Sequence, residues 1–359
     1  MKTILLFDHF VALGGAEKVS LQITWALPDC SLETAWADSE LFGAELKSGE
    51  LKHYGLAFFR HWFPTLSLCW FYLFRYVLAS RQVNLIVSGV FAPLVLLRRP
   101  KVANTLVYFH TFPSFVNLSV AQLRAKHGWL GALVFRGCSP MYCYLLRRSV
   151  QKAKWVFANS RSVQKRFKDI GIETQVLYPP MDLTGLQHHQ DKGYFLSTAR
   201  LEPNKRVELL LEAFAGLEDI QLHLVGGGSL EQELEARFGH YANIKFFGWM
   251  APEQLKTQYN DCKALIYIPE NEYFGLAPVE AMAAGKPVIG VAEGGLLETI
   301  TDTRLGVLLS IPLDLATLRQ NILQLHQETL SDLDISYRHQ QAMRFSDPYF
   351  MDQLRRYLL

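Results

Sequence analysis

Two glutamates in the second half of the chain, Glu272 and Glu280, stand eight residues apart in a segment that predicts a loop followed by a helix. Pro278 lies where a first helical turn accepts proline, and Gly285 lies where the helix would end. One carboxylate on the loop and one in the first turn can line a single cleft and accept hydrogen bonds from several hydroxyl groups, which sugars supply. The backbone N–H groups from Phe274 to Ala277 would face an anion such as a diphosphate.

Both halves of the chain also place glycines where a predicted strand gives way to a helix. These glycines are Gly14-Gly15 in the first half and Gly226-Gly227-Gly228 in the second. Such turns present backbone N–H groups to a phosphate, but a plain tight turn with positive φ requires glycine as well. Neither turn has the spacing Gly-x-Gly-x-x-Gly, and there is no Walker loop, so the sequence argues against nicotinamide chemistry and P-loop hydrolysis.

Short apolar segments alternate with helical patterns along all 359 residues, which is typical of parallel α/β layers. The strands predicted in the first half are Ile4–Asp8, Glu33–Ala37, Asn84–Ser88, Thr105–His110, Trp155–Asn159 and Gln175–Tyr178. Those predicted in the second half are Tyr194–Thr198, Gln221–Val225, Ile244–Phe247, Ala264–Ile268, Val288–Val291 and Gly306–Leu309. A proline pair at 179–180 and a polar stretch through Lys192 interrupt the pattern. We therefore expect two Rossmann-like, doubly wound α/β domains, residues 1–182 and 183–344.

Charge is distributed unequally between these two halves. Lys plus Arg minus Asp plus Glu is 21 − 11 = +10 for residues 1–182 and 15 − 23 = −8 for residues 183–359. From Leu51 to Lys168 there are eighteen Lys or Arg and no Asp or Glu. A stretch of this kind attracts polyanions: nucleic acid, anionic lipid headgroups or a phosphate-bearing substrate.

Apolar and aromatic residues are mixed into the basic stretch, in the segments 61–64, 66–74 and 129–135. Trp, Tyr and Phe beside Arg suit a membrane interface. The runs are too short to span a bilayer, because Arg60 and Arg75 bracket one and Arg136 closes another. We expect peripheral contact with an anionic membrane; the alternative is a core helix whose basic residues lie on a solvated face. No nucleic-acid recognition motif is present.

The cysteines and the N-terminus favour a cytoplasmic protein. The five cysteines are odd in number and include no Cys-x-x-Cys pair, which fits neither a disulfide framework nor a zinc ribbon. The apolar run Ile4–Phe7 is cut off by Asp8 and is too short for a signal peptide.

The segment with Glu272 and Glu280 resembles the Glu-x7-Glu motif of the retaining glycosyltransferases of family 4. The likeness covers most of the chain, with motifs in the family's order: Asn159-Ser160-Arg161 with Tyr178-Pro179-Pro180, Thr198-Ala199-Arg200-Leu201 with Lys205-Arg206, Leu224-Val225-Gly226-Gly227-Gly228, and Phe246-Phe247-Gly248-Trp249. The resemblance implies the GT-B architecture, two Rossmann-like domains facing across a cleft. The first would bind the acceptor and the second the nucleotide sugar, and a terminal helix at 345–359 would pack back on the first.

The resemblance also implies roles for single residues. Arg200 and Lys205 would bind the donor diphosphate and offset the charge of the leaving group. Glu272 would bind hydroxyls of the transferred sugar, Glu280 those of the ribose, and His110 matches the position of the family's donor-sugar histidine. The implied catalytic residues are His110, Arg200, Lys205 and Glu272, and the implied donor-binding residues are Gly14, Gly15, Gly226, Gly227, Gly248, Trp249, Met250, Phe274, Gly275, Leu276, Ala277 and Glu280.

In this scheme the base lies near Gly248–Met250 and the 226–228 turn, and Gly14 and Gly15 close on the phosphates from the other domain. For two of these residues a role in structure alone is the alternative. A lone histidine at a strand end, such as His110, is as often structural, and Arg200 with Glu202 could form a surface ion pair.

For the mechanism, the resemblance implies transfer with retention of configuration, in which the nucleoside diphosphate departs and the acceptor attacks the same face. No carboxylate nucleophile and no metal or other cofactor is then required, because cations and amides stabilise the leaving phosphate. Asp332-Leu333-Asp334 is interpreted as solvated surface rather than as a metal site.

The donor is expected to be a UDP-hexose, with UDP-glucose first, and the acceptor a glycan, lipid-linked, in polysaccharide biosynthesis at the inner face of the membrane. GDP-mannose is the alternative donor, although His110-Thr111-Phe112-Pro113 departs from a His-Thr-Pro-x-Arg stretch of mannosyl-transferring relatives by the extra Phe112 and the missing Arg. Other classes that remain are an epimerase or phosphorylase of the same architecture and a non-catalytic sugar-nucleotide sensor.

Overall fold

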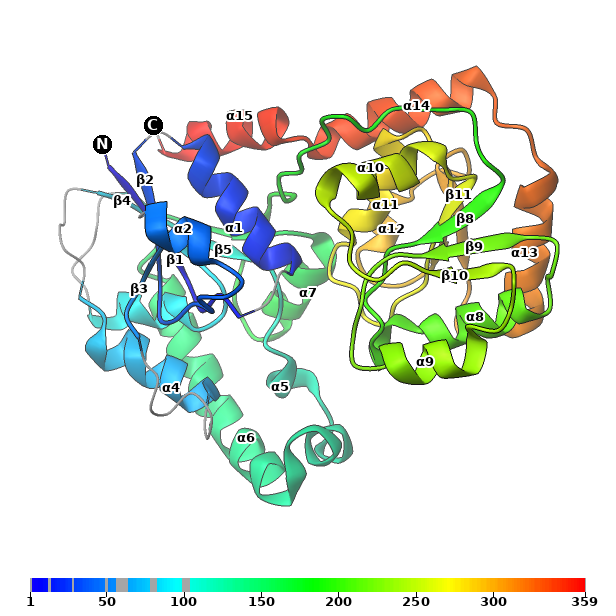
Figure 1. Cartoon of the computed structure of the whole chain (residues 1–359). Coiled ribbons are helices and arrows are strands. Elements are labelled where there is room, and N and C mark those ends of the chain that lie inside the picture. The colour runs from blue at the N-terminus through cyan, green and yellow to red at the C-terminus, as the bar shows by residue number, and fades with distance from the viewer. Residues whose placement is uncertain are drawn as a thin grey trace. The chain divides into compact units, whose positions relative to one another are not determined.

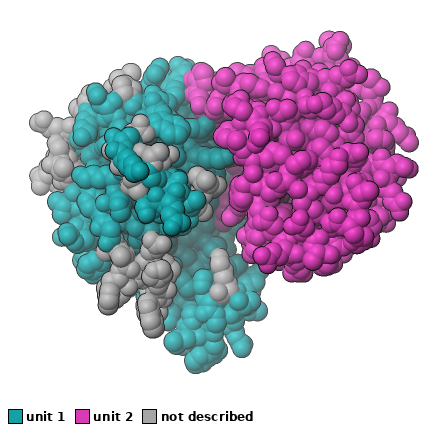
Figure 2. All heavy atoms as spheres, in the orientation of Figure 1, with its two compact units in different colours: residues 1–180, 350–359 teal, residues 181–349 magenta. Residues whose placement is uncertain are grey.

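The computed structural model describes residues 2–11, 14–27, 29–48, 51–55, 64–77, 83–98 and 104–358. The chain forms two compact units, coloured teal and magenta in Figure 2. Unit 1 consists of Met1–Pro180 and Phe350–Leu359, and unit 2 of Met181–Tyr349. The boundaries predicted from the sequence lie at 182/183 and 344/345.

Unit 1 is built on a seven-stranded parallel sheet with the strand order β3-β2-β1-β4-β5-β6-β7 (Figure 1). Its strands are β1 (Thr3–Phe7), β2 (Cys30–Thr34), β3 (Leu51–His53), β4 (Asn84–Ser88), β5 (Asn104–Phe109), β6 (Trp155–Ala158) and β7 (Gln175–Val176). Every residue of the central strands β1 and β4 is buried. Such burial is expected where helices cover both faces of a parallel sheet, and it explains why these strands are uniformly apolar in sequence.

Most strands of unit 1 lie where the sequence predicts them, but two differ. β2 spans Cys30–Thr34, so the predicted strand Glu33–Ala37 was wrong by three residues at each end. The residues Ala35, Trp36 and Ala37 are buried without belonging to the sheet ladder, and their apolar character drew the prediction towards them. β3 was missed, because its three residues Leu51–His53 include two exposed polar ones and form an edge.

The helices of unit 1 lie between these strands. They are α1 (Gly15–Ala26), α2 (Gly43–Ser48), α4 (Pro64–Trp70), the π-helical turn η1 (Phe71–Arg75), the 3-10 helix η2 (Ala92–Arg98), α5 (Ser114–Asn117), α6 (Val120–Val150) and α7 (Arg161–Asp169). α15 (Asp347–Leu358) comes from the far end of the sequence. Its residues Phe350, Met351, Leu354 and Leu358 belong to the same buried cluster as Leu5 and Leu32 of the sheet.

Unit 2 repeats the architecture with a six-stranded parallel sheet of order β10-β9-β8-β11-β12-β13. The strands are β8 (Tyr194–Ser197), β9 (Gln221–Leu224), β10 (Ile244–Phe246), β11 (Ala264–Tyr267), β12 (Val288–Val291) and β13 (Gly306–Leu309). The helices are η3 (Pro203–Lys205), α8 (Val207–Ala215), α9 (Glu231–Phe238), α10 (Pro252–Asp261), α11 (Leu276–Ala283), α12 (Leu296–Thr299), α13 (Leu315–Gln327), α14 (Asp332–Ala342) and η4 (Met343–Phe345). Each predicted strand of this half contains the observed one. The expectation of two doubly wound parallel sheets is confirmed.

Each sheet has one topological switch point, at which the chain stops adding strands towards one edge and begins adding them towards the other. The strand order 3-2-1-4 puts this switch between β1 and β4 in unit 1 and between β8 and β11 in unit 2. The loops that leave neighbouring strands there turn to opposite faces of the sheet, which opens a crevice at the carboxyl ends of the strands. Ligands of open α/β sheets bind at such crevices, so the switch points are where functional side chains are sought.

The packing of α15 on unit 1 generates a stability prediction. Leu354 is buried in the sheet-and-helix cluster, whereas its neighbour Arg355 is exposed. Leu354→Ala should lower the free energy of unfolding of unit 1 by about 2–5 kcal/mol, because it leaves a cavity between helix and sheet. Urea titration followed by circular dichroism measures this, with Arg355→Ala as the matched control. A loss no larger than that of the control would contradict the packing of α15.

Candidate functional site

The residues singled out in the second half of the sequence come together at the carboxyl edge of the unit 2 sheet. β8 leads into the loop with Arg200 and Lys205, β11 into the loop with Glu272, and α11 carries Glu280. β9 leads into Gly226–Gly228, and β10 into Gly248–Met250. Because β8 and β11 flank the switch point, the cationic loop and the acidic loop emerge on its two sides.

An ion pair joins these two loops. Lys205 Nζ lies 2.6 Å from Glu272 Oε2, and the side chains of both are largely buried, 12% and 17% exposed. The Tyr267 hydroxyl at the end of β11 donates to the same carboxylate oxygen at 2.7 Å. The loops are also joined through their backbones, because Glu270 N–H donates to Asn204 O at 2.7 Å. Burial, with the Glu272 charge beside it, raises the pKa of Tyr267 well above its usual value, so the phenol remains a donor.

A second tyrosine fixes the other carboxylate. The buried Tyr259, on α10, donates from its hydroxyl to Glu280 Oε2 at 2.6 Å and lies 2.9 Å from Thr198 Oγ1. Since the tyrosine proton goes to Glu280, the threonine hydroxyl donates to the tyrosine oxygen. Burial, with the Glu280 charge, raises the pKa of Tyr259 well above its usual value. Glu280 is thereby held at the sheet edge by Tyr259 of α10, which is itself fixed by Thr198 directly after β8.

The two arginines of the cationic loop, Arg200 and Arg206, differ in exposure and in contacts. Arg200 is exposed to solvent. Arg206 turns back into the protein: its Nη1 donates to Ile268 O and Pro269 O, and it pairs with Glu270 and Glu293. Glu202 receives hydrogen bonds from Ser229 N and Oγ, which hold its pKa below the usual value. The charge of Arg200 also lowers the pKa of Glu202, so the two are electrostatic neighbours, although the hydrogen bonds of Glu202 go to Ser229.

The start of α11 is built to leave backbone N–H groups available. Gly275 is its N-cap residue, with φ +85°, and it supplies no side-chain hydrogen bond to the first turn. The loop after β12 supports this turn from below, where Gly295 N–H donates to Glu272 O at 2.9 Å. Gly294, with φ +60°, passes so close to Glu272 O that a Cβ there would collide with it. The glycine pair in Glu293-Gly294-Gly295 is the sequence feature that could have predicted this supporting loop.

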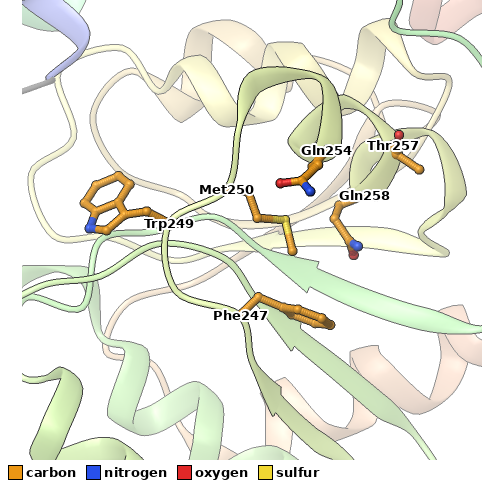
Figure 3. A pocket seen from close by; sticks show the side chains of 6 residues that line it. All are labelled: Phe247, Trp249, Met250, Gln254, Thr257 and Gln258. Carbon is orange, nitrogen blue, oxygen red and sulfur yellow. The ribbon is translucent and has the colours of Figure 1, made fainter.

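A pocket of about 430 Å³ opens beside the predicted base-binding segment (Figure 3). It is lined by Phe247, Trp249, Met250, Gln254, Thr257 and Gln258. Trp249 is largely exposed and lies against the turn after β9, since its Nε1 is only 2.7 Å from where a Cβ on Gly227 would be. Gly226 N–H donates to Gly248 O at 2.7 Å and joins the two loops. The pocket thus combines aromatic rings with side-chain amides, a composition that suits a planar heterocycle.

The remaining predicted residues belong to unit 1. Gly14 is the N-cap of α1, which Gly15 begins, and the helix has no side-chain cap. His110 follows β5 and is 4% exposed, with Nε2 2.5 Å from Ser88 Oγ and 3.4 Å from Ser20 Oγ of α1. The rings of Phe7 and Tyr108 pack edge-on against it. Burial lowers the pKa of His110 to about 3, so its imidazole is neutral.

The acidic segment Asp332-Leu333-Asp334 has a structural role. Asp334 N–H and carboxylate both bond Ser331 Oγ at the exposed start of α14, which makes Asp332-Leu333-Asp334 part of a helix cap rather than a cluster of ligands. Within the described ranges, no group of three or more His, Cys, Asp or Glu side chains could hold a metal ion.

The state of His110 generates a prediction for the site. Its Cε1–H resonance should not shift between pH 5 and 8, because the buried imidazole stays neutral until about pH 3. Two-dimensional NMR of the histidine ring protons measures this, with His110→Asn used to assign the peak. A midpoint between pH 5 and 8 would show that the ring is charged during activity and would contradict the buried environment described.

The residues of this site fall within a segment that matches a protein-family model. Residues 184–341 match the model of the family described as glycosyl transferases group 1. The α-1,3/1,6-mannosyltransferase ALG2 of Dictyostelium discoideum is 34% identical over 33% of this chain and 34% of its own length. ALG2 of Saccharomyces cerevisiae is 26% identical over 83% of this chain and 71% of its length. The chain thus spans from about a third to about 70% of the length of these two relatives.

The fold comparison covers both units. The crystal structure of Anabaena Alr3699/HepE in complex with UDP-glucose superposes with a TM-score of 0.73 at 19% identity, over 99% of each chain. WaaG, a glycosyltransferase involved in lipopolysaccharide biosynthesis, superposes with a TM-score of 0.66 at 15% identity. The chain therefore shares the two-unit fold of these solved structures, and residues 184–341 carry the match to the glycosyl transferases group 1 model.

Proposed function

We propose that the protein transfers a hexose, mannose from GDP-mannose first, to a lipid-linked glycan acceptor in polysaccharide biosynthesis at the inner face of a membrane. The observation that carries the proposal is the Lys205–Glu272 pair, with Glu280 fixed nearby by Tyr259, at the switch point of a group 1 domain. Base binding alone would not require two fixed carboxylates and a buried cation. This favours transfer over a non-catalytic sensor.

The choice of donor moves from UDP-glucose to GDP-mannose because of the relatives. UDP-glucose was expected from how common it is in the family, and no residue of this chain pointed to it. The curated relatives reported above are named mannosyltransferases. The structure with UDP-glucose, at 19% identity, supports the shared fold and not the donor. UDP-glucose therefore remains the comparison donor of the experiment below.

The extra Phe112 that weakened the match to mannosyl-transferring relatives has a packing explanation. Its side chain is 2% exposed and packs edge-on against Phe167 of α7, whose ring stacks on Phe109. The residue is accommodated by the core of unit 1 rather than at its surface. The extra Phe112 by itself is therefore no argument against mannose, whereas the missing Arg has no such explanation.

For the chemistry, we infer that Arg200 and Lys205 take the diphosphate, together with the N–H groups at the start of α11. These groups stabilise negative charge as the nucleoside diphosphate leaves, so they can act without a divalent cation. Glu272 would accept hydroxyls of the hexose and Glu280 those of the ribose. The acceptor hydroxyl would attack the face that the leaving group vacates and pass its proton to the departing phosphate, so the new glycosidic bond replaces the sugar–phosphate bond with retained anomeric configuration.

Donor binding would exchange contacts that already exist. In the structure Lys205 and Glu272 neutralise each other. When the donor enters, the ammonium group gains a phosphate and the carboxylate gains hydroxyls, so neither charge is left unpaired in a largely buried place. Tyr267 keeps Glu272 in position during the exchange.

Nucleotide release tests the proposal directly. With purified protein, slow release of GDP from GDP-mannose should exceed release of UDP from UDP-glucose, UDP-galactose or UDP-N-acetylglucosamine by at least about tenfold, and EDTA should not reduce it. Glu272→Gln and Arg200→Ala should each lower the rate about 100-fold, since each removes charge stabilisation at the transition state. Glu253→Gln, an exposed glutamate on α10, is the matched control.

Each other result assigns a different function. Preference for UDP-glucose would restore the original expectation, and loss of release in EDTA would refute the metal-independent step. Interconversion of sugar nucleotides without acceptor would indicate an epimerase. Binding of the nucleotide sugar without release of nucleotide, in the presence of extracted lipid-linked glycans, would indicate a non-catalytic sugar-nucleotide sensor.

The tyrosines give a second prediction. Tyr259→Phe removes the hydroxyl that holds Glu280, so KM for the donor should rise about 5- to 20-fold while kcat changes less than threefold. Tyr267→Phe, which frees Glu272 at the transferred sugar, should instead lower kcat. Steady-state kinetics of GDP release measure both. Equal effects of the two variants on KM and kcat would contradict the separate roles of the two carboxylates.

A further inference from the structure

Two neighbouring elements of unit 1 present apolar side chains to solvent. One is the α4–η1 segment and the other is α6. Cys69 of α4 lies close to Cys138 and Tyr142 of α6, and both elements pack against η2. Figure 1 shows α4 beside α6, with α6 extending away from the strands of the unit. The predicted aromatic segments 66–74 and 129–135 fall on these elements, whereas residues 61–63 lie outside the described residues.

α6 is apolar on two faces, one more than packing requires. Leu123, Ala132, Tyr142 and Leu146 point into unit 1 and are buried. On the solvent side, Trp129, Leu130 and Leu133 are 67%, 65% and 61% exposed, and Val134 and Met141 are exposed as well. A surface helix of a globular protein normally carries polar residues opposite its core face. The break at Gly128, with φ +72°, comes directly before this cluster and starts a new helical segment with it.

The neighbouring α4–η1 segment repeats the pattern. Leu68, Phe71 and Tyr72 are buried, and the Tyr72 hydroxyl donates to Phe7 O at 2.6 Å. On the solvent side, Leu66, Trp70, Phe74 and Val77 are 45%, 47%, 62% and 70% exposed. The core-helix alternative is therefore correct for one face of this segment only, and the other face is unaccounted for.

The charges around these faces are of one sign. Exposed Arg75, Arg98, Arg124, Arg136, Arg147, Arg148 and Lys152 belong to η1, η2, α6 and the turn that follows it. The sequence supplies no Asp or Glu between Leu51 and Lys168 to balance them. A second copy of the chain in a two-fold contact would bring these like charges together, which disfavours self-association through this surface. A negatively charged, apolar partner satisfies both features.

We propose that this surface, defined by Leu66, Trp70, Phe74, Trp129, Leu130 and Leu133, inserts into the interfacial layer of a bilayer with anionic headgroups. Aromatic and aliphatic side chains enter the headgroup boundary, and the surrounding arginines bind lipid phosphates. Neither signal alone gives stable attachment, but the two together do. The inference specifies the membrane side of the proposed function and does not depend on the identity of the donor.

Among the described residues, no helix combines the length and hydrophobicity needed to cross a bilayer. The test is accordingly one of peripheral binding. Wild-type chain should float with vesicles of 70% phosphatidylcholine and 30% phosphatidylglycerol at 50 mM salt, and binding should fall at least fivefold at 500 mM salt. Pure phosphatidylcholine vesicles should capture much less.

Variants separate the apolar from the basic contribution. Leu130→Asp with Leu133→Asp should reduce vesicle binding at least tenfold, whereas Leu333→Asp, at a residue 83% exposed on α14 of unit 2, should not. Arg136→Glu with Arg148→Glu should abolish the preference for anionic vesicles. Tryptophan fluorescence of wild type should shift to the blue on binding, and Trp70→Phe with Trp129→Phe should remove most of that shift.

The outcomes distinguish this inference from the proposed function. Since the substituted residues lie in unit 1 on α6, nucleotide release from a soluble donor should stay within about twofold of wild type, which also shows that the variants are folded. Normal release without vesicle binding would overturn the membrane surface and leave the transferase. Vesicle binding without nucleotide release would support the membrane surface and contradict the proposed transferase activity. Concentration-dependent dimerisation that Leu130→Asp with Leu133→Asp abolishes, without vesicle binding, would replace the membrane by a second copy.

Discussion

The contact between Lys205 and Glu272 is the interaction on which the unit 2 site depends. It joins the two loops that leave the sheet on either side of the β8–β11 switch point, and a buried tyrosine hydroxyl completes the coordination of the carboxylate. Removing either partner would leave the other charge largely buried and unpaired, which costs far more than the net gain from forming the pair. The pair therefore sets the distance between the loops, and through Glu270 and Asn204 also their backbones.

The two units have the same fold but differ in what binds the backbone N–H groups at their switch points. In unit 1 the carboxylate of Asp8 accepts hydrogen bonds from the N–H groups of Val90, Phe91 and Ala92, at the start of η2, at 2.6–2.9 Å. Burial raises the pKa of Asp8 to about 6 in spite of these bonds. In unit 2 the corresponding element after the fourth strand of the order is α11, whose first turn has no side-chain cap. Unit 1 thus supplies its own anion where unit 2 leaves donors for a phosphate.

The strands were predictable because a parallel sheet buried on both faces leaves an unambiguous pattern of apolar runs, as in residues 84–88 and 288–291. The edge strand Leu51–His53 could not be found that way, since an edge strand of three residues buries little. Glu272, Glu280 and Lys205 were predictable from spacing and resemblance, and the structure brings them to one edge of one sheet. What they do there stays a prediction.

Tyr259 and Tyr267 could not have been identified from sequence. Each belongs to a helix end or strand that is otherwise ordinary, and only the fold shows that the hydroxyls reach Glu280 and Glu272. Similarly, the sequence showed that segment 66–74 is both apolar and flanked by arginine, but not which residues face inwards. The π-helical turn at Phe71–Arg75 changes the helical phase, so a simple 3.6-residue period does not assign them.

The course of the chain through α15 makes unit 2 an insertion within unit 1. Residues on both sides of it, up to Pro180 and from Phe350 onwards, complete the same unit, and the two connections lie together where Asp347 N–H donates to Met181 O. During synthesis, the strands of unit 1 and all of unit 2 are made before Phe350, Leu354 and Leu358 are added. Unit 1 can therefore complete its packing only after the last residues of unit 2 have been made, and until then the face that α15 will cover stays exposed to water. Chaperones that hold apolar surface would find their binding site on unit 1 in that interval, although its strands were made first.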